Sequence, residues 1–446
     1  MVQKIIYLES YGCSANQNNA EIIAGILEKS GYIIVKNPEI KSDIAIINTC
    51  IVKGPTMQRM IFRIKELAKK HAKIIVIGCF VDYADERIKK LVKESNKKCL
   101  LSMVSVKQIG NIRKAVNDLL NGKENIFIER KNTEKTNKNR ELKLNKPKQN
   151  SNKIIGITQI SEGCVGNCAY CAVKLAKGDL FSYPRKEILE NIEKDLKSGA
   201  KEIWITSQDN AIYGLDKGKF ELPLLLRDIL KLKHRFVIRL GMMNPSSLKE
   251  ILPEMIEIYK DKKMLKFIHI PVQSGSDNVL REMNRPYKVK EFVDIIDKFR
   301  KEVPDILIST DIIIGYPTET QGDFQKTLDL IRLIQPNVVN LSRFWPMPKT
   351  KAAELDQLDP DILFGRSIIL KELCNKIALE KNINYLGKEI EILIDEKNKR
   401  GNLIGRNDNY KQILLPLNEK RVKIGDKIKV KIVGVSIGEL KGRVID

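Results

Sequence analysis

The regular alternation of short apolar runs with helical stretches constrains the fold of this chain more than any other feature. In residues 1–125, strand-like runs alternate with helical stretches near 17–30 and 56–71; the runs are KIIYLES (4–10), DIAIINT (43–49) and KIIVIG (73–78). Strands that alternate with helices are typical of a parallel sheet covered on both faces, so this segment is predicted to be a doubly wound α/β domain. The chain has 446 residues, enough for about three domains.

The same alternation continues from residue 154 to about 345. Six strand-like runs occur there, with amphipathic helical segments between most of them: IIGITQI, EIWITSQ, FVIRLGMM, FIHIPVQ, ILISTDIIIGY and VVNLSRF. Six βα units predict an open, partial (β/α)6 barrel, which with a helix near 361–382 would make a domain of residues 154–383. Residues 384–446 change to strands and turns, which predicts a small β-barrel of the size of RNA-binding modules.

A polar segment lies between the first two predicted domains, at 126–153. Its part from 131 to 153 contains eight Lys or Arg, two acidic residues and almost nothing apolar. Because such a segment buries too little apolar surface to offset the entropy of ordering, we expect a mobile, basic linker.

Charge and hydropathy bound the environment of the protein. Lys and Arg number 79 against 56 acidic residues, a net charge of +23, which favours encounter with a polyanion such as nucleic acid, although a lysine-rich composition alone explains it equally well. The tail from 384 has 14 basic and nine acidic residues, and neither it nor the linker reads as a specific basic stripe.

No apolar run approaches the roughly 18 residues that span a bilayer, and the N-terminus lacks a signal peptide, so we expect a cytoplasmic protein without membrane contact.

Cysteine spacing is the strongest local signal. In a reducing cytoplasm, closely spaced cysteines indicate metal or redox chemistry rather than disulfides. The segment GCVGNCAYC places Cys164, Cys168 and Cys171 in a C-x3-C-x2-C array after the strand IIGITQI. Three thiolates around a cubane iron-sulfur cluster leave one iron open for another ligand. The alternative is zinc held by three cysteines and one of the chain's three histidines, His71, His234 or His269.

Three further cysteines each follow a predicted strand of the N-terminal domain: Cys13, Cys50 and Cys79. The carboxyl ends of parallel strands line one crevice, so these three thiols are predicted to converge on a second cluster with an open iron. The alternative is that each is an ordinary buried cysteine at a strand end.

The C-x3-C-x2-C array at the first strand of a βα barrel resembles the radical S-adenosylmethionine (SAM) superfamily. The resemblance implies that the open iron chelates the amino and carboxylate groups of SAM, and that one electron cleaves SAM to methionine and a 5'-deoxyadenosyl radical.

With the N-terminal cysteines, the whole chain resembles the methylthiotransferases. The segments that carry this similarity are YGCSANQNNAE, NTC, GCF, SEGCVGNCAYC and a C-terminal barrel like the family's TRAM module, whereas Cys99 and Cys374 match no motif and are expected to be packing residues. The similarity implies two 4Fe–4S clusters, with radicals generated at the barrel cluster and sulfur held or donated at the N-terminal one. A methyl group from a second SAM would complete the product.

Within the barrel, TSQD, VIRLGMM and PVQSGSDNVLREMNR resemble the family's cofactor-binding segments. No catalytic side chain is identified, and for each residue packing or capping is an equal alternative. The residues expected to contact cofactor or substrate are Gln208, Asp209, Arg239, Gln273, Ser274 and Gly275.

The motifs TSQDNAIYGLD and LGMMNP are most similar to the archaeal and eukaryotic members that act on N6-threonylcarbamoyladenosine at position 37 of tRNA. The partners implied are the tRNA anticodon loop, an electron-donor protein and a sulfur source. Alternatives are another tRNA adenosine, an aspartate of a ribosomal protein, or a non-catalytic iron-sulfur protein that binds RNA. The chain departs from the family where Lys177 replaces a common arginine and where Met347 and Pro348 replace a glycine, both in the region predicted to bind substrate.

Overall fold

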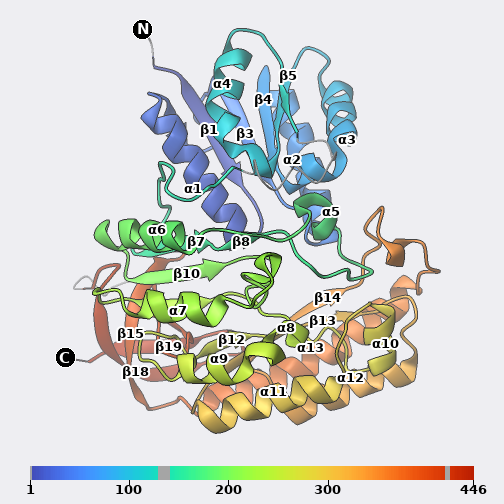
Figure 1. Cartoon of the computed structure of the whole chain (residues 1–446), viewed down its shortest axis with the longest axis vertical. Coiled ribbons are helices and arrows are strands. Elements are labelled where there is room, and N and C mark those ends of the chain that lie inside the picture. Colours follow the sequence, from blue (N-terminus) through green and yellow to red (C-terminus); the bar gives the residue numbers. More distant parts are fainter. Residues whose placement is uncertain (1–2, 129–140, 417–421, 446) are drawn as a thin grey trace. The chain divides into compact units, whose positions relative to one another are not determined.

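The computed structural model describes residues 3–128, 141–416 and 422–445, which fall into two compact units (Figure 1). The first unit contains residues 1–151, 157–191 and 347–350, and the second contains the remainder. Each unit is described by itself.

The first unit is built on a six-stranded sheet in the order β2-β1-β3-β4-β5-β6, and every neighbouring pair is parallel. In chain order the strands are β1 (Ile5–Ser10), β2 (Ile33–Val35), β3 (Ile44–Thr49), β4 (Lys73–Gly78), β5 (Leu100–Val104) and β6 (Ile126–Phe127). The doubly wound prediction is confirmed, although β2, β5 and β6 were not among the predicted strands. β2 and β6 are edge strands of three and two residues, in which the apolar signal is weak, whereas β5 is a mostly buried five-residue strand inside the sheet.

Four helices cover the two faces of this sheet (Figure 1). Apolar residues of α1 (Ser14–Lys29) and α4 (Ile112–Leu120) share one core with the sheet. Those of α2 (Gly54–Lys70) and α3 (Cys79–Ser95) share the other. Strands β3 and β4 are buried on both faces, which explains why they read as continuous apolar runs.

The prediction of a mobile linker is wrong for residues 141–151; residues 129–140 lie outside the described segments. The chain passes over α1 at Gly25, where an added Cβ would lie 2.4 Å from the Lys148 backbone nitrogen. The buried carboxylate of Glu21 accepts hydrogen bonds from the backbone and hydroxyl of Ser151, at 3.1 and 2.5 Å, and lies 3.6 Å from the Lys148 ammonium. Ion pairs and hydrogen bonds to buried carboxylates therefore order a segment that apolar burial could not.

Residues 157–191 add two short paired strands and a short helix to the first unit. These are β8 (Ser161–Glu162), β9 (Phe181–Ser182) and α5 (Val173–Lys177), while α6 (Arg185–Lys197) begins there. Residues Ala172 and Ala176 share an apolar core with α2 and α3.

The strands of the predicted partial barrel belong to the second unit, except that residues 157–159 of the first of them fall in the first unit. They form two parallel three-stranded sheets, β11-β10-β7 and β12-β13-β14, linked by a bridge between Ile238 and Met264. The bounds are β7 (Ile155–Gln159), β10 (Glu202–Thr206), β11 (Val237–Leu240), β12 (Phe267–His269), β13 (Leu307–Ile314) and β14 (Val338–Arg343). All six predicted strands are confirmed.

Seven helices accompany these strands in chain order: α7 (Leu222–Leu230), α8 (Pro245–Leu248), α9 (Leu252–Tyr259), α10 (Asp277–Glu282), α11 (Val289–Glu302), α12 (Gln321–Ile334) and α13 (Pro360–Ile383). Across the described segments, the helices lack an apolar stretch of the length needed to traverse a membrane.

The C-terminal residues of the second unit form a closed barrel in the order β15-β16-β17-β19-β18, as predicted. The strands are β15 (Glu389–Lys397), β16 (Leu403–Arg406), β17 (Gln412–Leu414), β18 (Lys427–Val435) and β19 (Leu440–Val444). The barrel docks on the rest of its unit, where Lys201 donates to the Gly425 carbonyl at 2.6 Å and the Lys266 backbone donates to that of Asp408 at 2.7 Å.

Candidate metal centres and cofactor-binding residues

The structure places the three N-terminal cysteines where the sequence predicted. Cys13 follows β1 and caps α1, Cys50 follows β3, and Cys79 is the first residue of α3 after β4. Because β1, β3 and β4 are adjacent parallel strands, the three thiols lie along one edge of the sheet.

Close packing brings these thiols together. Gly12 has a φ of +113°, and a Cβ there would lie 2.8 Å from the Cys50 sulfur. Asn16 donates to the carbonyls of Tyr11 and Thr49, both at 2.8 Å, and its Oδ1 lies 4.0 Å from the Cys79 sulfur. Asn16 therefore joins all three strand ends. The sequence analysis missed it, although it lies inside the quoted segment YGCSANQNNAE.

Burial controls the ionisation of two of these thiols. It raises the pKa of Cys50 to about 11 and that of Cys79 to about 12, while the nearby Lys177 ammonium opposes both shifts. Protonated, buried thiols are poor nucleophiles, which argues against reactive cysteines. Metal binding requires and stabilises the thiolate, so an iron-sulfur cluster fits this donor set.

Cys164, Cys168 and Cys171 lie in the loop between β8 and α5 of the first unit, and all three are partly exposed. The Gly166 backbone donates to the Cys164 sulfur at 3.2 Å. A Cβ at Gly166 would lie 3.3 Å from that sulfur and 3.9 Å from the Cys168 sulfur. The loop therefore winds around a residue with no side chain and turns two sulfurs toward the same place.

The arrangement of ligands differs from that of a single-ion site. Among the described residues, no three His, Cys, Asp or Glu side chains are grouped closely enough to hold one metal ion. A cubane spaces its thiolates more widely, because each binds a different iron. His71 stacks on Tyr7, and His269 Nε2 lies 2.9 Å from Asp311, so both have other partners.

The residues expected to contact SAM all belong to the second unit. Gln208 and Asp209 follow β10, Gln273, Ser274 and Gly275 follow β12, and Arg239 lies within β11.

Asp209 is buried, and burial raises its pKa to about 6. Its carboxylate accepts from the backbones of Ala211 and Asn244, both at 3.1 Å, and from the Ser247 hydroxyl at 3.3 Å. Asp209 thus fixes the loops that follow β10 and β11.

Arg239 is surrounded by aromatic rings. Its guanidinium carbon lies 5.5, 5.3 and 5.7 Å from the ring centres of Trp204, Phe267 and Tyr410. These contacts are typical of a cation–π cluster, and they connect the α/β part of the second unit to its C-terminal barrel.

Gln273 shows the clearest sign of a missing polar partner. Its backbone has a φ of +72°, and its buried Oε1 has no hydrogen-bond partner among the described residues. The hydroxyl of Ser207, which follows β10 and which the sequence analysis missed, is buried without a partner in the same way. Buried polar groups are normally satisfied, so such atoms at strand carboxyl ends suit a polar ligand such as the amino acid end of SAM.

Gly275 approaches α12, where an added Cβ would lie 2.5 Å from the Thr327 Cα.

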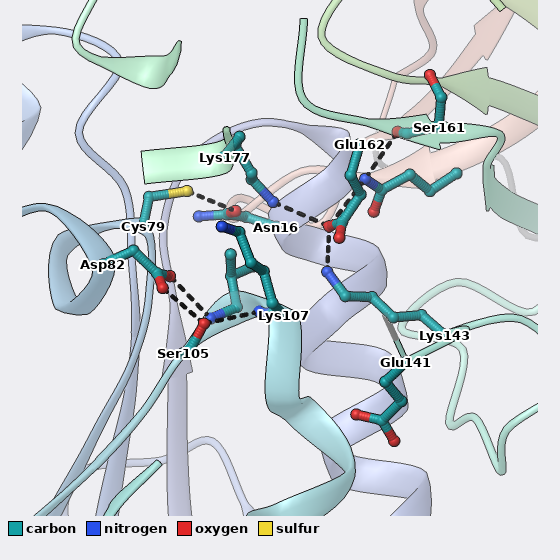
Figure 2. Close-up of polar contacts among 12 residues, drawn as sticks. Asn16, Cys79, Asp82, Ser105, Lys107, Glu141, Lys143, Ser161, Glu162 and Lys177 are labelled. Carbon is teal, nitrogen blue, oxygen red and sulfur yellow. Dashed lines mark hydrogen bonds and ion pairs between the residues drawn. The ribbon is translucent and has the colours of Figure 1, made fainter. Parts of the chain in front are cut away.

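Two departures from the family pattern lie in the first unit. Lys177 is buried at the end of α5 and its ammonium lies 3.2 Å from Glu162 (Figure 2). Met347 is buried in the apolar core that contains Cys79, and the Tyr83 hydroxyl donates to the Pro348 carbonyl. Both sites thus pack around α3 and α5, which explains why an apolar residue occupies position 347.

Comparisons with known proteins agree with this architecture. Residues 158–331 match the Radical SAM superfamily, residues 5–99 match Uncharacterized protein family UPF0004, and residues 384–445 match the TRAM domain. The radical SAM methyltransferase TsrM from Kitasatospora setae, solved with cobalamin and a 4Fe–4S cluster, is similar with a TM-score of 0.54 and 13% identity, over 79% of this chain and 77% of that one. At this identity the likeness concerns the fold alone. The class is indicated by the match of residues 158–331 to the Radical SAM superfamily.

Curated relatives resolve the family. A probable threonylcarbamoyladenosine tRNA methylthiotransferase of Pyrococcus horikoshii is 38% identical over 93% of this chain and 94% of its own length. The threonylcarbamoyladenosine tRNA methylthiotransferase of Drosophila melanogaster is 31% identical over 99% of this chain and 78% of its own length. The chain belongs to the threonylcarbamoyladenosine tRNA methylthiotransferase family.

Proposed function

We propose that this protein is a radical SAM enzyme that converts N6-threonylcarbamoyladenosine at position 37 of tRNA to its 2-methylthio derivative. The observation that carries the proposal is similarity to relatives of that name along nearly the whole chain, from the N-terminal sheet through the C-terminal barrel. The six cysteines at two strand-end sites support the same chemistry.

Cys164, Cys168 and Cys171 would hold a 4Fe–4S cluster, and Cys13, Cys50 and Cys79 a second one. The first cluster, when bound, supplies the electron that cleaves SAM. The chain would contribute three thiolates to each cluster, which would leave one iron of each without a protein ligand. The Gly166 amide, which donates to the Cys164 sulfur, stabilises that thiolate.

Gln273 and Ser207 would bind the polar end of SAM through the buried oxygen atoms that have no partner among the described residues. Asp209 would position these loops rather than contact the cofactor, since its carboxylate accepts three hydrogen bonds from neighbouring residues. A fixed cofactor geometry lowers the entropic cost of reaction.

The C-terminal barrel would contact tRNA through a basic row that strand pairing creates. On β18, Lys427, Lys429 and Lys431 are exposed at alternate positions, and Lys431 is the register partner of the exposed Arg443 on β19. On the other side of β18, Glu389 and Glu391 of β15 are the register partners of Lys431 and Lys429, and Glu391 is ion-paired with Lys427, so the positive charge is least compensated toward β19. Side chains on one face of paired strands lie close together, so these charges suit a phosphate backbone. The sequence alone did not indicate such a stripe.

Anaerobic assay tests the proposal. Reconstituted protein is incubated with reductant, SAM, a sulfide source and tRNA that carries threonylcarbamoyladenosine, and 5'-deoxyadenosine and the methylthio nucleoside are quantified. The full protein should bind about eight iron and form both products. An electron-donor protein should replace the chemical reductant in the cell.

Two triple variants separate the sites. Alanine at Cys164, Cys168 and Cys171 should halve the iron and abolish both products. Alanine at Cys13, Cys50 and Cys79 should halve the iron, leave 5'-deoxyadenosine formation running, and abolish sulfur transfer. Methylthio product from the second variant would contradict the assigned sulfur role, and SAM cleavage with product only on a ribosomal protein would contradict the tRNA substrate. Absence of SAM cleavage by fully loaded protein would leave a non-catalytic RNA-binding protein.

A further inference from the structure

Lys177 is a buried ammonium held in a fixed place. Its side chain is 2% exposed and its Nζ lies 3.2 Å from Glu162 Oε1. The same oxygen is contacted by the buried Lys143 ammonium and accepts from Gln159 Nε2 at 3.1 Å. Figure 2 shows Lys177 and Lys143 reaching this carboxylate from different segments. A carboxylate held by three donors anchors Lys177 tightly.

The other side of Lys177 faces the N-terminal thiols. Figure 2 shows its amine directed between Glu162 and the pair formed by Asn16 and Cys79. Glu162, Cys79 and Cys13 all favour the charged amine, and together they raise the pKa of Lys177 against the effect of burial.

Packing of α5 on α3 creates this arrangement. Cys79 and Phe80 at the start of α3 share one apolar core with Ala172, which immediately precedes α5, and with Ala176 within α5. The same packing sets Lys177, the last residue of α5, next to the thiols. The positive charge is therefore as fixed as the core, unlike that of a surface lysine.

We propose that Lys177 is a positioning residue for the N-terminal cluster, at which its ammonium supplies a fixed positive charge that stabilises the thiolate ligands and the reduced state. The inference rests on the proposed assignment of Cys13, Cys50 and Cys79 to a cluster. Reduction adds one negative charge to a cluster, and cluster potentials depend on nearby charge, hydrogen bonds and exposure. A buried cation favours the reduced form, because charges interact strongly away from water.

The test isolates the N-terminal cluster. Full-length protein with alanine at Cys164, Cys168 and Cys171 is reconstituted, and the midpoint potential of the remaining cluster is measured by redox titration followed by electron paramagnetic resonance. Lys177→Met, Lys177→Arg and Lys90→Met are compared in this background. Lys90 lies on α3 and is 78% exposed, so it provides a surface-charge control on the helix that Cys79 begins.

Lys177→Met should lower the equilibrium constant for reduction of the cluster at least tenfold. For a one-electron couple, this corresponds to a midpoint potential that is lower by about 59 mV or more. Lys177→Arg and Lys90→Met should match the parent. If Lys177→Met prevents cluster loading while Lys177→Arg loads normally and all variants unfold at the same temperature, the requirement for charge is supported.

Two results overturn the inference: an unchanged potential in loaded Lys177→Met, or equal loss of the cluster in Lys177→Met and Lys177→Arg. A parent that binds no iron is a different failure, because it contradicts the cluster assignment of the proposed function before Lys177 is tested.

Discussion

Gly12 is the position where a single methyl group should damage the N-terminal site most directly. Its φ of +113° is a conformation that side chains rarely adopt, and the added Cβ of Gly12→Ala would lie 2.7 Å from the Cys50 Cβ and 2.8 Å from its sulfur. Backbone strain costs about 1–3 kcal/mol. Overpacking against Cys50 adds about 1–3 kcal/mol more. We expect an unfolding free energy lower by about 2–6 kcal/mol and reduced iron at the N-terminal site.

Gly31 provides the matched control in the same unit. Its φ is +89°, but a Cβ there meets no atom within 4 Å. Gly31→Ala should therefore show the strain alone, about 1–3 kcal/mol, with full iron content. The comparison separates backbone strain from displacement of Cys50.

Denaturant unfolding of the protein before reconstitution gives the free energies, and iron analysis after reconstitution gives the cluster content. If Gly12→Ala and Gly31→Ala lose equal stability and both bind about eight iron, the close approach of Cys50 to Gly12 has no consequence and the reasoning is refuted.

Three other changes test separate parts of the molecule. Burial and, to a smaller extent, the nearby Asp395 raise the pKa of the Glu202 carboxyl from 4.5 to about 7. The native state therefore binds this proton more tightly than the unfolded state does, so the unfolding free energy should fall as the pH rises from about 4.5 to 7. Glu202→Gln should flatten that part of the pH–stability curve, by on the order of 3 kcal/mol, and an unchanged slope would contradict the shift. Alanine at Lys431 and Arg443 should weaken tRNA binding and lower the slope of log K against log salt by up to about two units, whereas alanine at the exposed Lys186 and Lys197 of α6 should not; equal effects would remove the basic row from the contact surface. Serine at Cys99 or Cys374, whose thiols burial holds at a pKa of about 11, should retain full iron and turnover, and loss of a cluster in either would show that the ligands are misassigned.

Local sequence was sufficient for the elements that position the thiols. The strand that ends at Thr49 is followed at once by Cys50, and the strand that ends at Gly78 by Cys79. The rule that strand carboxyl ends share one edge then brought these residues together without knowledge of the packing. The edge strands β2 and β6 were missed because such short strands carry little periodic signal, and the five-residue strands β5 and β19 were missed as well.

The sequence by itself determined the order of βα units, the C-terminal barrel and the strand-end position of the cysteines, because these depend on periodicity and on neighbours along the chain. Tertiary structure alone decided that residues 157–191 join the N-terminal sheet in one compact unit, and hence that both sets of cysteines belong to it. It also decided that Lys143 and Lys177 share Glu162, that Glu21 orders residues near Ser151, and that Lys431 pairs with Arg443. Buried polar contacts and strand register join residues that are far apart in sequence, so composition could not reveal them. For this reason, composition predicted a mobile linker where the structure has an ordered segment, and it did not indicate the row of basic residues that strand pairing creates.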